Sequence, residues 1–265
     1  MSQLLSRHWM GWMDWEVPNA VNAVMLGSCF SNEMALRCRE KGWDVLSNPM
    51  GTLFQPEVIA QWLCFSHGEK GWNPKSQVVL DDNLYKCLAG GKVLNHAKES
   101  DLLQDIDWVG SQIRLNLQKA HVLVITFGTA YAWKYLPFSS NVGNCQRLNQ
   151  LDFEQHLLDL DAVFQLWQST IVMLKQNYPQ LKIVFTVSPV RHERLGVMEN
   201  NLSKSCLRVL CHRLSQLNDV RYFPSYEWVV DELRDYRFYK VDGCHPNEEA
   251  VDFVFDNWIN SFYYV

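Results

Sequence analysis

The fold is determined by one stretch near the amino terminus, Ala23-Val24-Met25-Leu26-Gly27-Ser28-Cys29-Phe30-Ser31. Its apolar run predicts a buried strand over 21–26, and the residues that follow predict a helix over 33–41. Gly27 allows a sharp turn between them. In an open α/β sheet the carboxyl ends of the strands face the ligand crevice, so Ser28 is expected there, beside the positive end of the helix. This position suits a nucleophile, although a serine here can also serve only to cap the helix.

A second chemical signal lies near the carboxyl terminus, in Asp242-Gly243-Cys244-His245-Pro246-Asn247. The acid and the histidine are three residues apart in a turn that precedes a predicted helix over 248–262. Ser, Asp and His in this chain order can form a triad: the serine attacks, the histidine takes its proton, and the carboxylate orients the imidazole. The sequence therefore predicts Ser28, Asp242 and His245 as catalytic residues. The alternative is a surface turn with an incidental histidine.

Both ends together resemble the signature of the GSCFA-domain family, which is similar to the wider SGNH (GDSL-type) hydrolases. Further stretches also resemble that family and occur in family order: 48–52, 126–130, 142–145, 186–192, 222–227 and 231–239. The resemblance implies an ester hydrolase whose favoured substrate is an O-acetyl group on a carbohydrate. The supply of Trp and Tyr side chains suits stacking on sugar rings.

The resemblance also places an oxyanion-hole glycine after the second strand, where Gly51 is the best match. Only glycine lets a backbone N–H approach a bound oxyanion closely, and the Asn48 side chain is a second candidate donor. The alternative is a turn that serves only the topology. SGNH hydrolases usually have a Gly-x-Asn-Asp motif after the next strand, whereas this chain has Gly128-Thr129-Ala130. Asn144, in the following loop, or Thr129 would then supply the missing donor; a turn-forming Asn144 is the alternative.

Two basic residues follow the strand predicted over 181–187. Arg191 can bind a substrate carboxylate or, in a structural salt bridge, anchor the loop. His192 can line the site and is a rival for the role of base, but it lacks the adjacent acid that His245 has. His96, at the exit of a predicted hairpin, is expected to be a surface histidine without a catalytic role.

Strand signals at 22–26, 44–46, 121–127, 182–187 and 220–223 alternate with helical segments, among them a long helix predicted over 153–176. This alternation predicts one three-layer α/β/α domain over 1–265, flavodoxin-like as in SGNH proteins, around a parallel sheet of about five strands. Residues 1–20 are expected to pack on the body as an arm, and 76–96 form a small β-hairpin insertion. The candidate loops all follow carboxyl ends of strands, so they should meet at one edge.

Composition excludes several classes of function. The 265 residues carry a net charge of −5 without a basic run, which argues against a nucleic-acid partner. No apolar run reaches transmembrane length, and no signal peptide is visible, so a cytoplasmic protein without a membrane partner is expected, unless a leader has been removed from the chain. The eight cysteines show no metal-binding spacing, and no metal or cofactor is expected. The sequence does not predict the oligomeric state.

The leading hypothesis is a serine ester hydrolase of SGNH type. Ser28 would attack the acyl carbon, His245 would shuttle the proton and Asp242 would orient His245. The N–H groups of Ser28 and Gly51, with Asn144 or Thr129, would hold the oxyanion. An O-acyltransferase with the same triad is the near alternative. A non-catalytic glycan- or protein-binding module on a degenerate scaffold, and Cys29 as nucleophile, are further alternatives.

Overall fold

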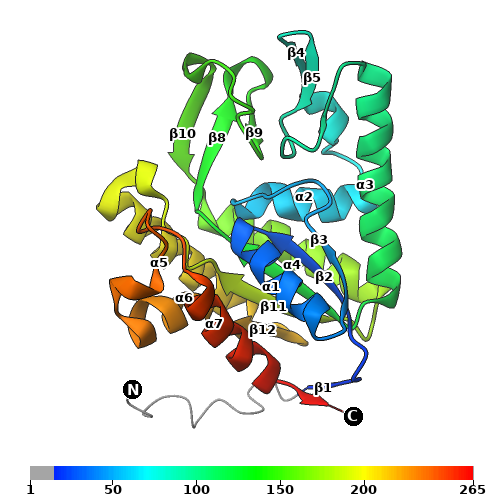
Figure 1. Ribbon diagram of the computed structural model, residues 1–265. Helices are drawn as coiled ribbons and strands as arrows, with labels where there is room; N and C mark the ends of the chain where they lie inside the picture. Colours follow the sequence, from blue (N-terminus) through cyan, green and yellow to red (C-terminus); the bar gives the residue numbers. More distant parts are fainter. Residues whose placement is uncertain (1–14, 265) are drawn as a thin grey trace.

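The computed structural model describes residues 15–264, and its centre is a five-stranded parallel sheet (Figure 1). The strand order is β12-β11-β7-β2-β3. The strands are β2 (Asn22–Gly27), β3 (Asp44–Ser47), β7 (Val122–Phe127), β11 (Lys182–Val187) and β12 (Val220–Phe223). These strands confirm the α/β architecture with a parallel sheet of five strands.

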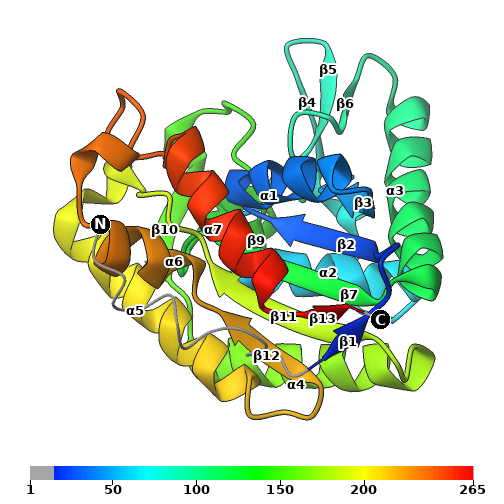
Figure 2. The same ribbon diagram turned by 60° about the horizontal axis from the view of Figure 1, so that its bottom comes forward.

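Helices cover both faces of this sheet (Figure 2). One face carries α1 (Cys29–Glu40) and α7 (Glu248–Asn260). The other face carries α3 (Glu99–Lys119), α4 (Leu160–Asn177) and α5 (Gly196–Leu214), with α2 (Pro56–Ser66) packed on α3 and α4. A short α6 (Ser225–Glu227) continues as a π-helical turn, Trp228–Leu233.

Alternation along each strand explains the two cores. In β2, Val24 and Leu26 enter the core under α3, whereas Ala23 and Met25 enter the core under α1 and α7. Both sets of side chains are apolar because both faces of a parallel sheet are covered. The sequence therefore shows a continuous apolar run at this strand and not an alternation of apolar and polar residues.

A second, antiparallel sheet was missed by the sequence analysis. It has the order β10-β8-β9 and consists of β8 (Tyr131–Tyr135), β9 (Ser140–Val142) and β10 (Phe153–Leu157). The helix predicted over 153–176 is therefore wrong at its start. Phe153–Leu157 pairs with β8, and α4 begins only at Leu160. Asp159 caps this helix, since its Oδ1 accepts the N–H of Asp161 at 2.9 Å.

A third small sheet lies where the sequence predicted the hairpin. It comprises β4 (Val78–Asp81), β5 (Leu84–Cys87) and β6 (Asn95–His96). Asp82 and Asn83 both have positive φ, as a two-residue hairpin turn requires. Together with the β8 sheet, this sheet stands beyond the carboxyl ends of the central strands (Figure 1).

At the opposite edge, β1 (Glu16–Val17) pairs in parallel with β13 (Tyr263–Tyr264). Most of the predicted arm, residues 1–14, lies outside the described residues, but Trp15 is buried. Short 3-10 turns complete the chain: Pro74–Gln77, Leu136–Phe138, Gln150–Asp152, Glu193–Leu195 and Tyr236–Phe238. Within residues 15–264 none of the helices combines the length and the apolar character needed to cross a bilayer.

Candidate active site

Ser28 stands between β2 and α1 and occupies the N-cap position of the helix. Its backbone N–H donates to Thr126 O at 3.0 Å, which ties the turn to β7. Its side chain makes no capping hydrogen bond, and Oγ has no hydrogen-bond partner among the described residues although the residue is only 1% exposed. A buried hydroxyl without a partner costs about 1–3 kcal/mol. Such groups need a reason, and a catalytic role is one.

The turn before Ser28 requires glycine. Gly27 has φ of +133°, and a Cβ on it would lie 2.1 Å from Thr126 O. Its N–H donates to Asn48 Oδ1 at 2.7 Å, while Asn48 Nδ2 donates to Asn32 Oδ1 at 2.8 Å. Both polar atoms of the Asn48 side chain are thus used to hold the turn. These two bonds make Asn48 a residue that positions the turn before Ser28, whereas the sequence analysis suggested that its side chain binds the substrate or its oxyanion.

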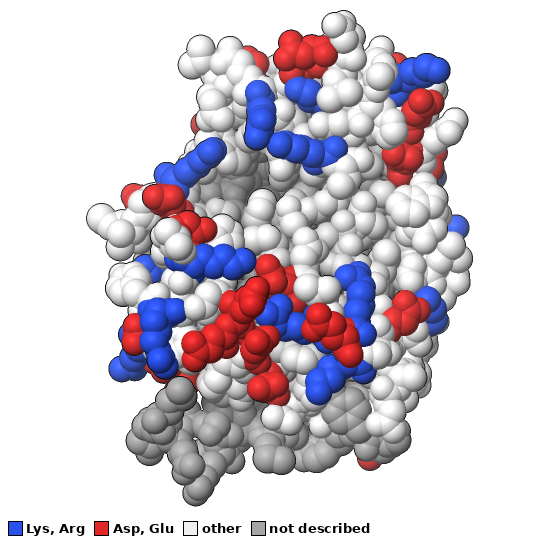
Figure 3. All heavy atoms as spheres, in the orientation of Figure 1, with Lys and Arg blue, Asp and Glu red and all other residues white. Residues whose placement is uncertain are grey.

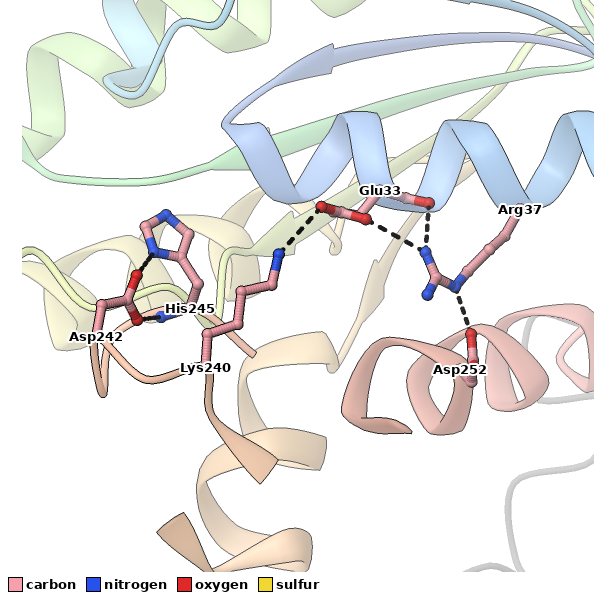
Figure 4. Close-up of polar contacts among 6 residues, drawn as sticks. All are labelled: Glu33, Arg37, Lys240, Asp242, His245 and Asp252. Carbon is pink, nitrogen blue, oxygen red and sulfur yellow. Dashed lines mark hydrogen bonds and ion pairs between the residues drawn. The ribbon is translucent and has the colours of Figure 1, made fainter. Parts of the chain in front are cut away.

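Asp242 and His245 form a hydrogen-bonded pair (Figure 4). His245 Nδ1 donates to Asp242 Oδ2 at 2.7 Å, and Asp242 Oδ1 accepts the backbone N–H groups of His245 and Cys244 at 3.0 and 2.9 Å. These donors, first the backbone N–H of His245, lower the pKa of Asp242 to about 2. Because an ionised carboxylate only accepts, the imidazole proton is on Nδ1. Nε2 then carries the lone pair that a base needs, and it has no hydrogen bond with the described residues.

A chain of ion pairs joins the helix that begins at Ser28 to the loop that carries the pair (Figure 4). Lys240 Nζ lies 3.7 Å from Glu33 Oε1, and Glu33 Oε2 lies 3.3 Å from Arg37 Nη1. Arg37 Nε also contacts Asp252 Oδ1 of α7 at 2.6 Å. Acidic and basic side chains alternate across this part of the surface (Figure 3). Exposed ion pairs stabilise by only about 0–1 kcal/mol each, so this chain of contacts adds little to the stability of the fold.

Ser28, Asp242 and His245 line one cavity of about 500 Å³. Arg191 and His192 line it too, so the structure brings five predicted site residues together. The other lining residues are Cys29, Phe54, Ser188, Val190, Glu193, Arg194 and Cys244. The hydrogen bond from Ser28 Oγ to His245 is not made, since that hydroxyl has no partner. Catalytic hydrogen bonds often tighten only in the substrate complex.

The other expected oxyanion donors are placed elsewhere. Gly51 N–H donates to Asn48 O at 2.8 Å, and a Cβ on Gly51 would lie 2.8 Å from Gly91 Cα. Thr129 Oγ1 accepts the N–H of Tyr131 at 3.0 Å. Asn144 Oδ1 accepts the N–H of Gln146 at 2.8 Å. None of the three lines the cavity of Ser28. Their polar groups serve turns, and the glycine serves a close backbone approach.

Arg191 and His192 extend the site at the end of β11. The Arg191 guanidinium lies over the rings of Tyr239 and Tyr236, 5.1 and 5.7 Å from their centroids. It has no ion pair within residues 15–264, so the structural salt bridge considered as an alternative is not formed there. The His192 ring meets Phe54 edge-on at 5.4 Å. Burial, followed by the charges of Lys204 and His245, lowers the pKa of His192 to about 4.

Sequence reasoning missed Lys204, a buried lysine that is hydrogen-bonded to Ser188 in the lining of this cavity. Its Nζ donates to Gly128 O and Ser188 O, both at 2.7 Å, just beyond the ends of β7 and β11. Burial lowers its pKa to about 7. A signal was present, because Lys204 shares the apolar face of α5 with Leu207 and Cys211, three and seven residues on. A lysine on such a face needs an internal acceptor.

Cys29 faces the same cavity but is poorly suited to be the nucleophile. Burial raises the pKa of its thiol, and the N–H groups of Phe30 and of Cys29 itself offset this rise only in part. The thiolate is the reactive form of cysteine, so a raised pKa lowers its reactivity at neutral pH. Ser28 is the better candidate.

A family model described as the GSCFA family matches residues 22–258, a range that includes Ser28, Asp242 and His245. The chain belongs to the GSCFA family. This GSCFA protein is similar to the solved structure of a proposed acylhydrolase from Bacteroides fragilis NCTC 9343, with a TM-score of 0.45, 12% identity, and coverage of 98% of this chain and 97% of that chain. It is also similar to a carbohydrate esterase family 3 protein from Talaromyces cellulolyticus, with a TM-score of 0.31, 9% identity, and coverage of 55% and 61%. Likenesses this weak carry no argument about activity. No curated protein matches the chain.

Proposed function

We propose that this GSCFA protein is a serine ester hydrolase of SGNH type that removes O-acetyl or other short acyl groups from a carbohydrate or related small substrate. One observation carries the proposal. The buried, unpartnered hydroxyl of Ser28 lines the same cavity as the Asp242–His245 pair, whose Nε2 is free to accept a proton.

The proposed reaction follows from these groups. Ser28 Oγ attacks the acyl carbon while His245 Nε2 takes the hydroxyl proton. Asp242 holds the imidazole and stabilises its charged form. The proton then passes to the leaving alkoxide, and the acyl group stays on Ser28 as an ester. A water molecule, deprotonated by His245, hydrolyses that ester and restores the serine.

A second chamber of about 340 Å³ adjoins the cavity and supports a sugar-sized alcohol part. It shares Arg191, His192, Glu193 and Cys244 with the first cavity and adds Asn200, Asn201 and Tyr226. Amide and phenol groups can hydrogen-bond to sugar hydroxyls, and the tyrosine face can stack on a sugar ring. The acyl group would occupy the chamber beside Ser28, and the alcohol part the second one.

Hydrolysis is favoured over acyl transfer because water reaches the base. The side chains of Asp242 and His245 are 48% and 43% exposed. An acyltransferase must keep water from its acyl-enzyme, whereas water can reach a base as exposed as His245.

The test is the hydrolysis of p-nitrophenyl acetate and of an O-acetylated sugar by the wild type, Ser28→Ala and Ser31→Ala. Ser31 is the matched control, since its hydroxyl is also buried and unpartnered but does not line the cavity. Ser28→Ala should lose at least about a thousandfold in rate, and Ser31→Ala should retain activity. Equal rates for wild type and Ser28→Ala would overturn the proposal and favour a non-catalytic binding module.

A further inference from the structure

Attack by Ser28 would create an oxyanion, and the donors that the sequence suggested for it are engaged elsewhere or lie outside the cavity. The N–H groups of Ser28 and Gly51 are donated to Thr126 O and Asn48 O. Neither Thr129 nor Asn144 lines the cavity. Removal of one oxyanion donor from a hydrolase costs about 10²–10³ in kcat, so an efficient enzyme needs a replacement.

We propose that His192 is that donor, and that its imidazole N–H binds the oxyanion formed when Ser28 attacks the ester. The inference rests on the proposed function and assigns a further catalytic residue to it. Three observations support it: the place of the ring, its unused nitrogens and its charge.

The ring is held close to the nucleophile turn through Phe54. The N–H of Leu53 donates to Gly27 O at 2.9 Å, which fixes Phe54 beside the turn that carries Ser28. Phe54 O accepts the N–H groups of Gly128 and Thr129 at 2.7 and 3.0 Å, which fixes it at the end of β7 as well. His192 packs edge-on against Phe54, at an interplanar angle of 88°. His192 and the end of β7 therefore both contact Phe54, and an asparagine is absent from Gly128-Thr129-Ala130 at that strand end.

The backbone of His192 is held by a hydrogen bond, but the nitrogens of its ring are not hydrogen-bonded. The N–H of His192 donates to Asn200 Oδ1 at 2.9 Å, on α5. Neither ring nitrogen makes a hydrogen bond with the described residues. One N–H of the ring is thus held at the cavity without a partner, as expected of a donor that acts on a ligand.

The charge of the ring matches this role. Burial, with Lys204 beneath and His245 beside it, lowers the pKa of His192 to about 4, so the ring is neutral at pH 7 and keeps one N–H. His245 must gain a proton during the reaction, and a second charged imidazole nearby would oppose that gain. Lys204 is a positioning residue here. Its Nζ joins Gly128 O to Ser188 O, and its positive charge adds to the burial that lowers the pKa of His192.

The experiment compares His192→Leu, His192→Asn and Ser28→Ala on p-nitrophenyl acetate. His192→Leu should lower kcat about 10²–10³-fold with KM changed only a few-fold, because the lost contact exists only in the transition state. His192→Asn should recover at least tenfold over His192→Leu, because its amide is also a neutral donor. Unfolding midpoints of all variants check the fold.

A second readout uses methylboronic acid, whose tetrahedral serine adduct carries the oxyanion. Its inhibition constant should rise in His192→Leu in parallel with the loss in kcat. Wild-type kcat in His192→Leu, or equal impairment in both His192 variants, would overturn this inference alone. If His192→Leu does not fold, His192→Asn decides: near-wild-type kcat and boronate affinity support a donor role, and a loss as large as in Ser28→Ala opposes it. Equal activity in wild type and Ser28→Ala would instead overturn the proposed function.

Discussion

Replacing Lys204 by methionine should change how the stability of the fold depends on pH. In the folded protein burial lowers the pKa of Lys204 from 10.5 to about 7. Between these two values the unfolded chain holds a proton that the folded protein has released. The unfolded state then binds more protons, and the free energy of unfolding rises with pH across this window.

The size of this rise follows from the shift. Each pKa unit corresponds to about 1.36 kcal/mol, so the full shift from 10.5 to about 7 corresponds to about 5 kcal/mol. Lys204 titrates gradually around each of the two pKa values, so the free energy of unfolding rises by only about 3 kcal/mol of this total between pH 7 and pH 9.5. Lys204→Met lacks this rise. It also leaves Gly128 O and Ser188 O without their lysine donor, which shifts its stability by the same amount at every pH.

The assay is urea unfolding of wild type and Lys204→Met at pH 7, 8 and 9.5 in the presence of a reductant. The wild type should gain about 3 kcal/mol relative to Lys204→Met from pH 7 to pH 9.5, with equal m-values. Lys70→Met, at an exposed lysine, controls for the loss of one positive charge. If the difference in stability between wild type and Lys204→Met is the same at every pH, burial does not lower the pKa of Lys204 in the folded protein.

Three further predictions concern the site. Asp242→Asn should lower kcat by about 10⁴, since an amide in place of the carboxylate favours the wrong imidazole tautomer; a loss below tenfold on p-nitrophenyl acetate would contradict the assigned tautomer. Gly51→Ala should lower the free energy of unfolding by about 1–3 kcal/mol in urea titrations, because its Cβ would meet Gly91 at 2.8 Å and φ is +86°; an unchanged midpoint would oppose this. Arg191→Gln should lower kcat/KM at least tenfold for an ester that carries a carboxylate and little for p-nitrophenyl acetate, because Arg191 has no ion pair among the described residues; equal effects on both esters would assign Arg191 to the loop alone.

The central sheet and the Asp242–His245 pair were predictable because their signals are local. A continuous apolar run marks β7, which is buried on both faces, and Gly27 marks the turn before Ser28. Asp242 and His245 are close in sequence, so one turn brings them together whatever the rest of the chain does. The β8–β10 sheet was missed because Phe153–Leu157 is a strand only through its pairing with Tyr131–Tyr135, some twenty residues earlier. Sequence periodicity in a short segment does not carry that information.

The details of the site were less predictable for the same reason. Whether Gly51 offers its N–H to a ligand depends on Asn48 O, and whether Asn144 faces the cavity depends on the path of the β8–β10 sheet. The burial of Lys204 was readable from the face of α5, but its acceptors, Gly128 O and Ser188 O, come from two other elements. Roles that depend on contacts distant in sequence become visible only in the folded chain.

Labelling with a serine-reactive p-nitrophenyl phosphonate, followed by peptide mass spectrometry, would identify the nucleophile of this protein. The reagent should modify one residue, Ser28, with loss of esterase activity, and His245→Ala should slow the labelling strongly because the base that activates the serine is gone. Labelling of Cys29 or Ser188 in place of Ser28, or labelling at an undiminished rate in His245→Ala, would contradict the account.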